Sequence, residues 1–187
     1  MSSFDLRIER FLIRRYKEKY QFLTIFPNSL LAEAPSILCV GARLGGEVRA
    51  FKRLGVMAIG IDIEPGNRSR HVLVGDAHDI LFPDSSFDAL YVNVIDHIKY
   101  LPVFAREAKR VLKTNGRLVV DMDSFPPDEW AVHDLRTFWG HDAERKSIRV
   151  EESFLLYFKE QAFEVSSKQL VEDKEGGGII VNIIFQC

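Results

Sequence analysis

The fold is decided by one stretch, Ser36-Ile37-Leu38-Cys39-Val40-Gly41-Ala42-Arg43-Leu44-Gly45-Gly46-Glu47, in which an apolar run precedes a glycine turn and a helical pattern. A second apolar run, Met57-Ala58-Ile59-Gly60-Ile61-Asp62, ends on an acid about 20 residues after the first glycine of the turn. A strand, a glycine turn and a helix, followed by an acid at this spacing, are typical of a unit that binds a mononucleotide. The pattern therefore predicts an α/β fold with a ligand at the glycine turn.

Arg43 argues against a dinucleotide ligand. A dinucleotide-binding turn has the pattern G-x-G-x-x-G, because its second glycine lets the backbone approach a pyrophosphate. Arg43 occupies that position here, and its side chain would crowd a pyrophosphate. The sequence favours a nucleoside ligand without phosphates. The ribose of such a ligand would require a carboxylate such as that of Asp62.

Two further segments complete a resemblance. The first begins Gly75-Asp76-Ala77-His78 and continues to Phe82-Pro83-Asp84-Ser85-Ser86-Phe87-Asp88, and the second is Arg110-Val111-Leu112-Lys113-Thr114-Asn115-Gly116. With the glycine turn and Asp62, this order resembles the class I S-adenosyl-L-methionine (SAM)-dependent methyltransferases, particularly their small-molecule, methyltransferase-domain-11-like branch. The resemblance covers about residues 36–123 and implies methyl transfer from SAM by a Rossmann-like domain.

The resemblance also implies where SAM would bind. Asp62 would hold the ribose hydroxyls, with Ile63 beside it, and Asp76 with Ala77 would recognise the adenine. The residues expected around the methionine end of the cofactor are Gly41, Ala42, Gly45 and Asn93.

Two residues depart from the family pattern. Cys39 stands where the family carries an acid, and Arg43 stands where it carries a glycine. Arg43 could bind the cofactor carboxylate, since a guanidinium matches a carboxylate in a bidentate way, or it could point to solvent. Together the departures leave open a domain that no longer binds the cofactor.

Candidates for catalysis follow the fourth and fifth strands. Asp96 and His97 lie at the carboxyl edge, where open α/β sheets bind ligands. A histidine there could act as a general base near neutral pH, although His97 could equally cap the next helix. Asp121 and Asp123 are expected to flank the same crevice.

An insertion over residues 124–150 is expected on the substrate side. Loops at the carboxyl edge hold specificity in such scaffolds, so Trp130 and His133, with Asp123, are candidate contacts to a flat or apolar acceptor. The alternative is that the aromatic residues of the insertion cover the core. No cysteine or acid stands at zinc spacing from His133, so no metal is expected.

The remaining pattern predicts five parallel strands followed by a hairpin, and the resemblance implies a Rossmann-like, mostly parallel sheet of seven strands with helices on both faces. Parallel strands are expected near residues 36–41, 57–62, 71–75, 88–93 and 117–122, and helices near residues 44–54 and 99–113. Residues 151–187 predict a helix followed by an antiparallel hairpin, because glycines join two β-rich segments there.

The link between the second and third strands is unusually short. It comprises only residues 63–70, whereas parallel neighbours normally need a crossover of about a dozen residues or more. The helix there should be short or absent, and a partner subunit, for example in a homodimer, or the N-terminal helix could cover the exposed face.

Residues 1–30 are expected to contain an amphipathic helix over residues 4–20. Ile8, Leu12 and Tyr16 recur every four positions, and arginines line the opposite face. This basic face is either simply solvated or a surface for RNA, an acidic partner or lipid headgroups.

Size and composition set the class of protein. A chain of 187 residues, with 47% hydrophobic and 28% charged residues, is expected to form a single domain with an ordinary core. Neither a membrane span nor a signal peptide is expected, and two cysteines without metal spacing favour a reducing, cytoplasmic setting. A net charge of −2 gives no general attraction for nucleic acid.

The leading hypothesis is a SAM-dependent methyltransferase that acts on a small-molecule acceptor. One alternative is a methyltransferase-like binding module without turnover, which the two departures favour. Another is an RNA or protein methyltransferase that uses the basic N-terminal helix. A nicotinamide oxidoreductase is disfavoured by the missing glycine.

Overall fold

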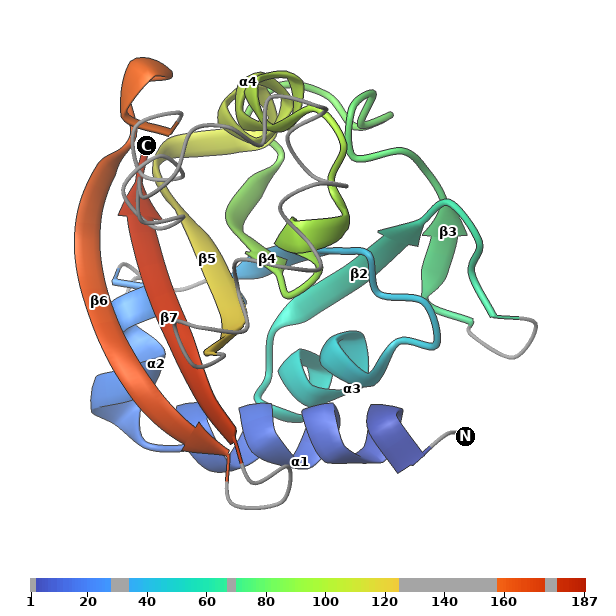
Figure 1. Cartoon of the computed structure of the whole chain (residues 1–187), viewed down its shortest axis with the longest axis vertical. Helices are drawn as coiled ribbons and strands as arrows, with labels where there is room; N and C mark the ends of the chain where they lie inside the picture. The colour runs from blue at the N-terminus through green and yellow to red at the C-terminus, as the bar shows by residue number, and fades with distance from the viewer. Residues whose placement is uncertain (1–2, 28–33, 67–69, 125–157, 174–177) are drawn as a thin grey trace, which may run out of the picture.

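The computed structural model describes residues 3–27, 34–66, 70–124, 158–173 and 178–187. A sheet of seven strands forms its centre, in the order β3-β2-β1-β4-β5-β7-β6 (Figure 1). The strands β1 to β5 run parallel, and β7 is antiparallel to both of its neighbours. The predicted Rossmann-like sheet with a C-terminal antiparallel hairpin is therefore confirmed. The strands are β1 (Ser36–Val40), β2 (Met57–Asp62), β3 (Val72–Val74), β4 (Phe87–Val92), β5 (Leu112–Ser124), β6 (Glu164–Asp173) and β7 (Gly178–Gln186).

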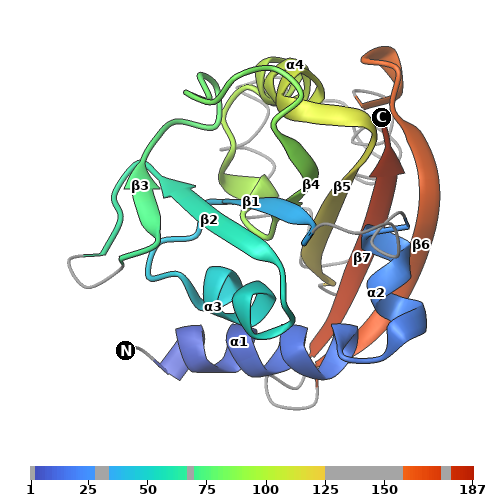
Figure 2. The ribbon, with the colours of Figure 1, turned by 180° about the vertical axis from the view of Figure 1, so that it is seen from behind.

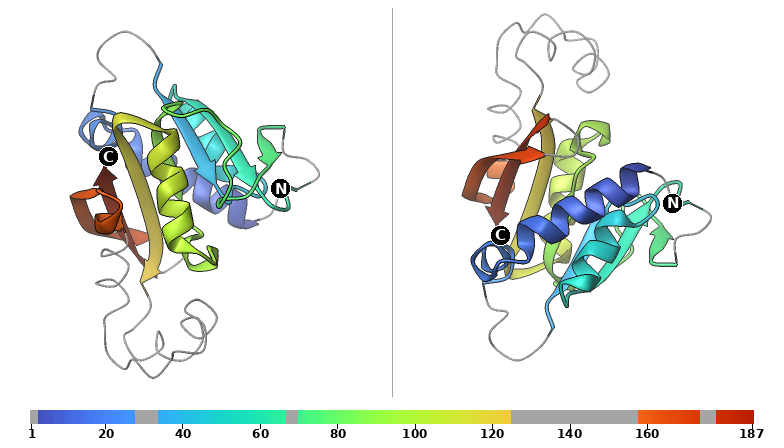
Figure 3. Two further views of the ribbon diagram at one scale, coloured as in Figure 1. Left: turned by 90° about the horizontal axis from the view of Figure 1, so that it is seen from above. Right: turned by 90° about the horizontal axis from the view of Figure 1, so that it is seen from below.

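Helices cover both faces of the sheet, as expected (Figures 2 and 3). The helix α4 (Leu101–Val111) packs on one face, where Phe104 and Ala108 join a core with strand residues such as Leu90. On the other face lies α3 (Gly46–Arg53), whose Val48 and Phe51 are fully buried. A single 3₁₀ turn, η1 (Ile95–His97), connects β4 to α4.

The strand β5 is longer than expected. It is predicted near residues 117–122 and covers Leu112–Ser124. Leu112 pairs with Phe87 of β4 at one end, and β7 pairs with the strand from Arg117 to Ser124 at the other. The expected insertion at residues 124–150, with Trp130 and His133, lies outside the described residues after Ser124. Of the helix expected within residues 151–161, residues 158–161 are described; residues 158–160 are helical and Gln161 is already in a turn.

The short link between β2 and β3 carries no helix in its described residues, 63–66 and 70–71. Its beginning is fixed by the glycine turn, because the Gly66 N–H donates to the Arg43 carbonyl at 3.0 Å. Val72 is buried in the same core as the α3 residues, while Leu73 and Val74 of the edge strand are exposed. The prediction of a lost helix is thus confirmed for the part of the link that is described.

The single N-terminal helix expected over residues 4–20 is wrong in one respect, because the chain bends at residues 17–18. It forms α1 (Ser3–Tyr16) and then α2 (Lys19–Ile25). A straight helix continues in one direction at about 1.5 Å per residue, whereas the bend returns Ile25 and Phe26 to the core that already holds Leu12 (Figure 2). No proline or glycine marks the bend, so packing alone accounts for it. None of the described helices is long and apolar enough to cross a membrane.

A buried polar cluster attaches α1 to the sheet. Asp121 of β5 is 3% exposed and accepts hydrogen bonds from the Tyr91 hydroxyl at 2.9 Å and the Asn182 amide at 2.6 Å. The Arg15 guanidinium of α1 lies 3.7 Å from the same carboxylate. The pKa of the Tyr91 phenol is raised well above its usual value, mainly because the group is buried and also because it lies beside the negative charge of Asp121. Asp121 therefore faces the helix layer, and the expectation that it flanks the crevice is wrong.

We predict that Asp121→Ala lowers the free energy of unfolding by about 3–5 kcal/mol, because it leaves the Arg15 charge buried without its carboxylate. The measurement is equilibrium denaturation in urea. The matched control is Asp84→Ala, which removes an ion pair between Arg110 and a carboxylate that is 75% exposed, and should cost about 0–1 kcal/mol. Equal losses in the two variants would contradict the role of the cluster.

Candidate functional site

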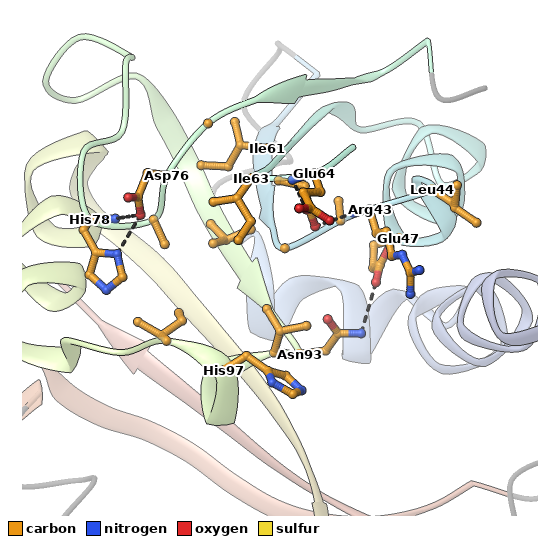
Figure 4. A pocket seen from close by; sticks show the side chains of 18 residues that line it. Arg43, Leu44, Glu47, Ile61, Ile63, Glu64, Asp76, His78, Asn93 and His97 are labelled. Carbon is orange, nitrogen blue, oxygen red and sulfur yellow. Dashed lines mark hydrogen bonds and ion pairs between the residues drawn. The ribbon is translucent and has the colours of Figure 1, made fainter. Parts of the chain in front are cut away.

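Four loops at the carboxyl ends of β1, β2, β3 and β4 enclose a cleft of about 730 Å³ (Figure 4). Ligands of open α/β sheets bind at this edge, and the volume lies in the range of small-molecule sites. The lining side chains come from positions far apart in the chain. The residues of the wall are Val40, Gly41, Ala42, Arg43, Leu44, Glu47, Ile61, Asp62, Ile63, Glu64, Gly75, Asp76, Ala77, His78, Asn93, Val94, His97 and Ile98.

Backbone hydrogen bonds join the glycine turn to the end of β2. The Gly41 and Ala42 N–H groups both donate to the Ile61 carbonyl, at 2.9 and 3.1 Å. Gly41 has φ +73°, and a Cβ there would lie 2.1 Å from Val94 Cγ2, so only glycine fits. Arg43 adopts φ +37°, which is costly for a residue with a side chain. Its N–H donates to Asp62 Oδ2 at 2.9 Å and its carbonyl accepts from the Gly66 N–H at 3.0 Å, and these two hydrogen bonds hold it in this conformation.

Backbone donors orient the carboxylate of Asp62. Its Oδ2 accepts from the Arg43 N–H at 2.9 Å and its Oδ1 from the Glu64 N–H at 2.8 Å. Each carboxylate oxygen has two lone pairs, so both oxygens keep acceptor capacity toward the cleft. A pair of ribose hydroxyls would match this arrangement.

Asp76 after β3 is oriented by His78. Its Oδ1 accepts from the His78 N–H at 2.8 Å and lies 2.6 Å from His78 Nδ1. The His78 backbone hydrogen bond is the largest influence that holds the pKa of this carboxyl below its usual value, and the imidazole contact adds to it against the effect of burial. The Tyr100 N–H donates to His78 Nε2 at 3.1 Å, so the neutral ring carries its proton on Nδ1. Asp76 Oδ2 accepts nothing from the described residues and remains an acceptor for a ligand.

Glu47 was missed by the sequence reasoning. It lies in the first turn of α3, is 4% exposed, and lines the cleft. The Asn93 amide, which follows β4, donates to its Oε1 at 3.0 Å (Figure 4). A glutamate at the start of a helix is common on surfaces, so nothing in the sequence distinguishes this one as buried.

Most residues expected around a cofactor come together in this wall. Gly45 is the exception: it has φ +76°, precedes α3, and does not line the cleft. Among the catalytic candidates, His97 lines the cleft from η1, whereas the side chain of Asp96 lies outside the described part of the structure. Asp123 pairs with Ile180 through its backbone, and its side chain is likewise not described. The side chain of Arg43 is exposed at the rim, and no described residue bonds its guanidinium.

Cys39 lies behind the cleft rather than in it. It is fully buried in the core between β1 and the helices α1 and α3. Burial, and to a smaller extent the negative charge of Glu47, raise the pKa of its thiol well above the usual value. A thiol of this kind is unreactive, because the nucleophile in thiol chemistry is the thiolate.

We predict that Cys39 does not react with a disulfide reagent such as dithionitrobenzoate in the folded protein. The variant Cys187→Ser isolates Cys39 as the single thiol. It should release no thionitrobenzoate under native conditions and one equivalent per chain in guanidinium chloride, as followed by absorbance. Rapid native reaction would show that the core around β1 opens easily.

The wall fits the chemistry of SAM. Acids at the ends of β2 and β3 offer acceptors for hydroxyls and for an amine, while Arg43 is the only lysine or arginine in the described wall. A cationic ligand is therefore favoured over a phosphate. No described group of three His, Cys, Asp or Glu side chains is arranged to hold a metal ion.

Comparisons with known proteins agree with this geometry. Residues 38–120 match the family model described as a methyltransferase domain. Demethylmenaquinone methyltransferase of Tropheryma whipplei (strain Twist) is 38% identical over 103 residues, which cover 48% of this chain and 42% of the relative. The 2-methyl-6-phytyl-1,4-hydroquinone methyltransferase of Synechocystis sp. is 32% identical over 135 residues, which cover 60% of this chain and 42% of the relative. The alignments thus span less than half the length of these curated relatives.

A solved structure supports the fold. The SAM-dependent methyltransferase from Aquifex aeolicus superposes with a TM-score of 0.57 over 93% of this chain and 96% of the other, at 16% identity. At that identity the likeness concerns the fold alone. Residues 38–120, which include the glycine turn, Asp62 and Asp76, are thus similar to a methyltransferase domain, and the fold around them is shared with this solved structure.

Proposed function

We propose that this chain transfers a methyl group from SAM to a small-molecule acceptor. The observation that supports it most is the pair of oriented carboxylates, Asp62 and Asp76, on successive strands of one cleft. Bound there, SAM would supply an electrophilic methyl carbon, whose bond to sulfur breaks as the electron pair of the acceptor attacks.

The order of the strands gives the order of the contacts. Neighbouring strands lie about 4.8 Å apart, so the walls at β3 and β4 are separated by about 14 Å. Asp76 at β3 would accept from the adenine amine, and Asp62 at β2 would hold the ribose. Gly41 at β1 and Asn93 after β4 would then surround the methionine end, which leaves the reacting methyl near η1.

The residues of the chain contribute mainly by position. Alignment of two bound reactants can supply about 7–11 kcal/mol of the barrier, and the fixed turn and carboxylates are suited to that task. His97 lines the cleft from η1, and it is our candidate base for an acceptor that must lose a proton. A general base adds about 10²–10⁴-fold.

We further propose a quinol-like aromatic ring as the acceptor class. Both curated relatives carry such a substrate in their names, a demethylmenaquinone and a phytyl hydroquinone. The test is transfer of radiolabelled methyl from SAM to demethylmenaquinol, to a short-chain methyl hydroquinone and to bulk RNA. Labelling of RNA with a steep salt dependence would instead favour the basic face of α1, and binding of SAM without transfer to any acceptor would favour a module without turnover.

We predict that Asp76→Asn shifts the preference of the cleft from adenine toward the 6-oxo purine hypoxanthine. The new side-chain amide would keep its oxygen toward His78, which offers donors, and would turn its NH₂ toward the ligand. Affinity for S-adenosylhomocysteine should fall about 10–100-fold, as expected for a lost charged hydrogen bond, while affinity for the 6-oxo analogue S-inosylhomocysteine should fall less or rise. Calorimetric titration measures both.

The matched control is Asp79→Asn, because Asp79 is exposed and close in sequence but does not line the cleft. It should leave both affinities within about twofold. Parallel losses for the two purines in Asp76→Asn would refute adenine recognition by this carboxylate.

A further inference from the structure

Glu47 is a buried acid in the wall of the cleft that the contacts proposed so far do not use. Its residue is 4% exposed, against exposed or half-buried positions for the other acids of the wall, Asp62, Glu64 and Asp76. Burial of a carboxylate is costly unless nearby groups stabilise its charge. A buried carboxylate in the wall of a ligand cleft can bind a cationic group of the ligand through a charge-assisted hydrogen bond.

The surroundings hold Glu47 in one orientation. The Asn93 amide donates to Oε1 at 3.0 Å, which joins the start of α3 to the end of β4. The position in the first turn of α3 places the carboxylate near the positive end of the helix dipole, which favours the ionised form. Asn93 thus acts as a positioning residue for a fixed negative charge.

The carboxylate lies at the methionine end of the proposed ligand path. It is bonded to Asn93 after β4 and follows the glycine turn after β1, whereas Asp76 lies at the opposite end, after β3 (Figure 4). Its charge also acts on the thiol of Cys39 and the phenol of Tyr91, which are buried on β1 and β4 directly behind this end of the cleft.

Building on the proposed function, we infer that the Glu47 carboxylate binds the ammonium group at the methionine end of the cofactor. It would do so in place of an acid on β1, where this chain has the buried and apolar Cys39. An ammonium donates to a carboxylate in a charge-assisted hydrogen bond, which is about twice as strong as a neutral one.

Glu47→Gln tests this, because glutamine keeps the shape and still accepts from Asn93 but carries no charge. Two ligands are titrated by calorimetry: S-adenosylhomocysteine, which has the ammonium, and 5′-methylthioadenosine, which lacks the amino-acid end. We expect the variant to lose about 10–100-fold in affinity for the first and less than about twofold for the second. The neutral sulfur of both ligands keeps the comparison free of the sulfonium charge.

Glu64→Gln is the matched control, since Glu64 is an exposed acid of the same wall. An equal loss of affinity in Glu64→Gln would overturn the inference, because it would mean that the negative charge of the whole wall attracts the ligand. An equal loss for both ligands in Glu47→Gln would also overturn it, because it would mean that the substitution damages the cleft as a whole. Unchanged binding by Glu47→Gln would overturn it while leaving the proposed function intact, whereas a wild-type protein that binds neither ligand would overturn both. Should Glu47→Gln fail to fold, Glu47→Asp, which keeps the charge but withdraws it by one methylene, must show a smaller loss that is equally selective for S-adenosylhomocysteine.

Discussion

The hydrogen bonds between the glycine turn and the end of β2 are the constraint on which the site depends. The Ile61 carbonyl accepts from Gly41 and Ala42, and one residue later Asp62 accepts from Arg43. The same contacts shape the floor of the cleft and aim the Asp62 carboxylate. Residues that follow β1 and β2 therefore line the cleft together.

A second set of contacts supports the turn from outside the cleft. Glu9 of α1 is almost fully buried and pairs with Arg49 at 2.8 Å, and Arg49 also donates to the Leu44 carbonyl at 2.8 Å. Farther along the same helix, Arg15 approaches Asp121 on the sheet. The N-terminal helix is thus part of the support of the ligand site, and only the outward side of its basic face, such as Arg10 and Arg14, is exposed.

The parts of the fold that local patterns control could be predicted. Short apolar runs ended by Gly, Asp or Asn predicted β1 to β4 to within one residue. The central strands β1 and β4 are apolar because they are buried on both faces. The absence of a helix from the described residues of the link between β2 and β3 followed from the length of the link and from Pro65 and Gly66 within it. The bend at residues 17–18 could not be predicted, since it depends on the burial of Ile25 and Phe26 against residues far away in the sequence. The extension of β5 to Ser124 likewise depends on its pairing with β7.

For the site, the sequence by itself determined the positions that need special chemistry: Gly41 for a positive φ, and Asp62 and Asp76 as acids that follow strands. Such residues are visible because a positive φ favours glycine and because an acid that follows a strand is typical of a nucleotide-binding unit. Only the tertiary structure decided which acids face the cleft. Asp121 lies near the end of a strand like the others but turns to Arg15, whereas Glu47, an ordinary helix residue in the sequence, enters the wall. The direction and burial of a side chain depend on neighbours brought by other strands and helices, and that information is distributed over the whole chain rather than held in a motif.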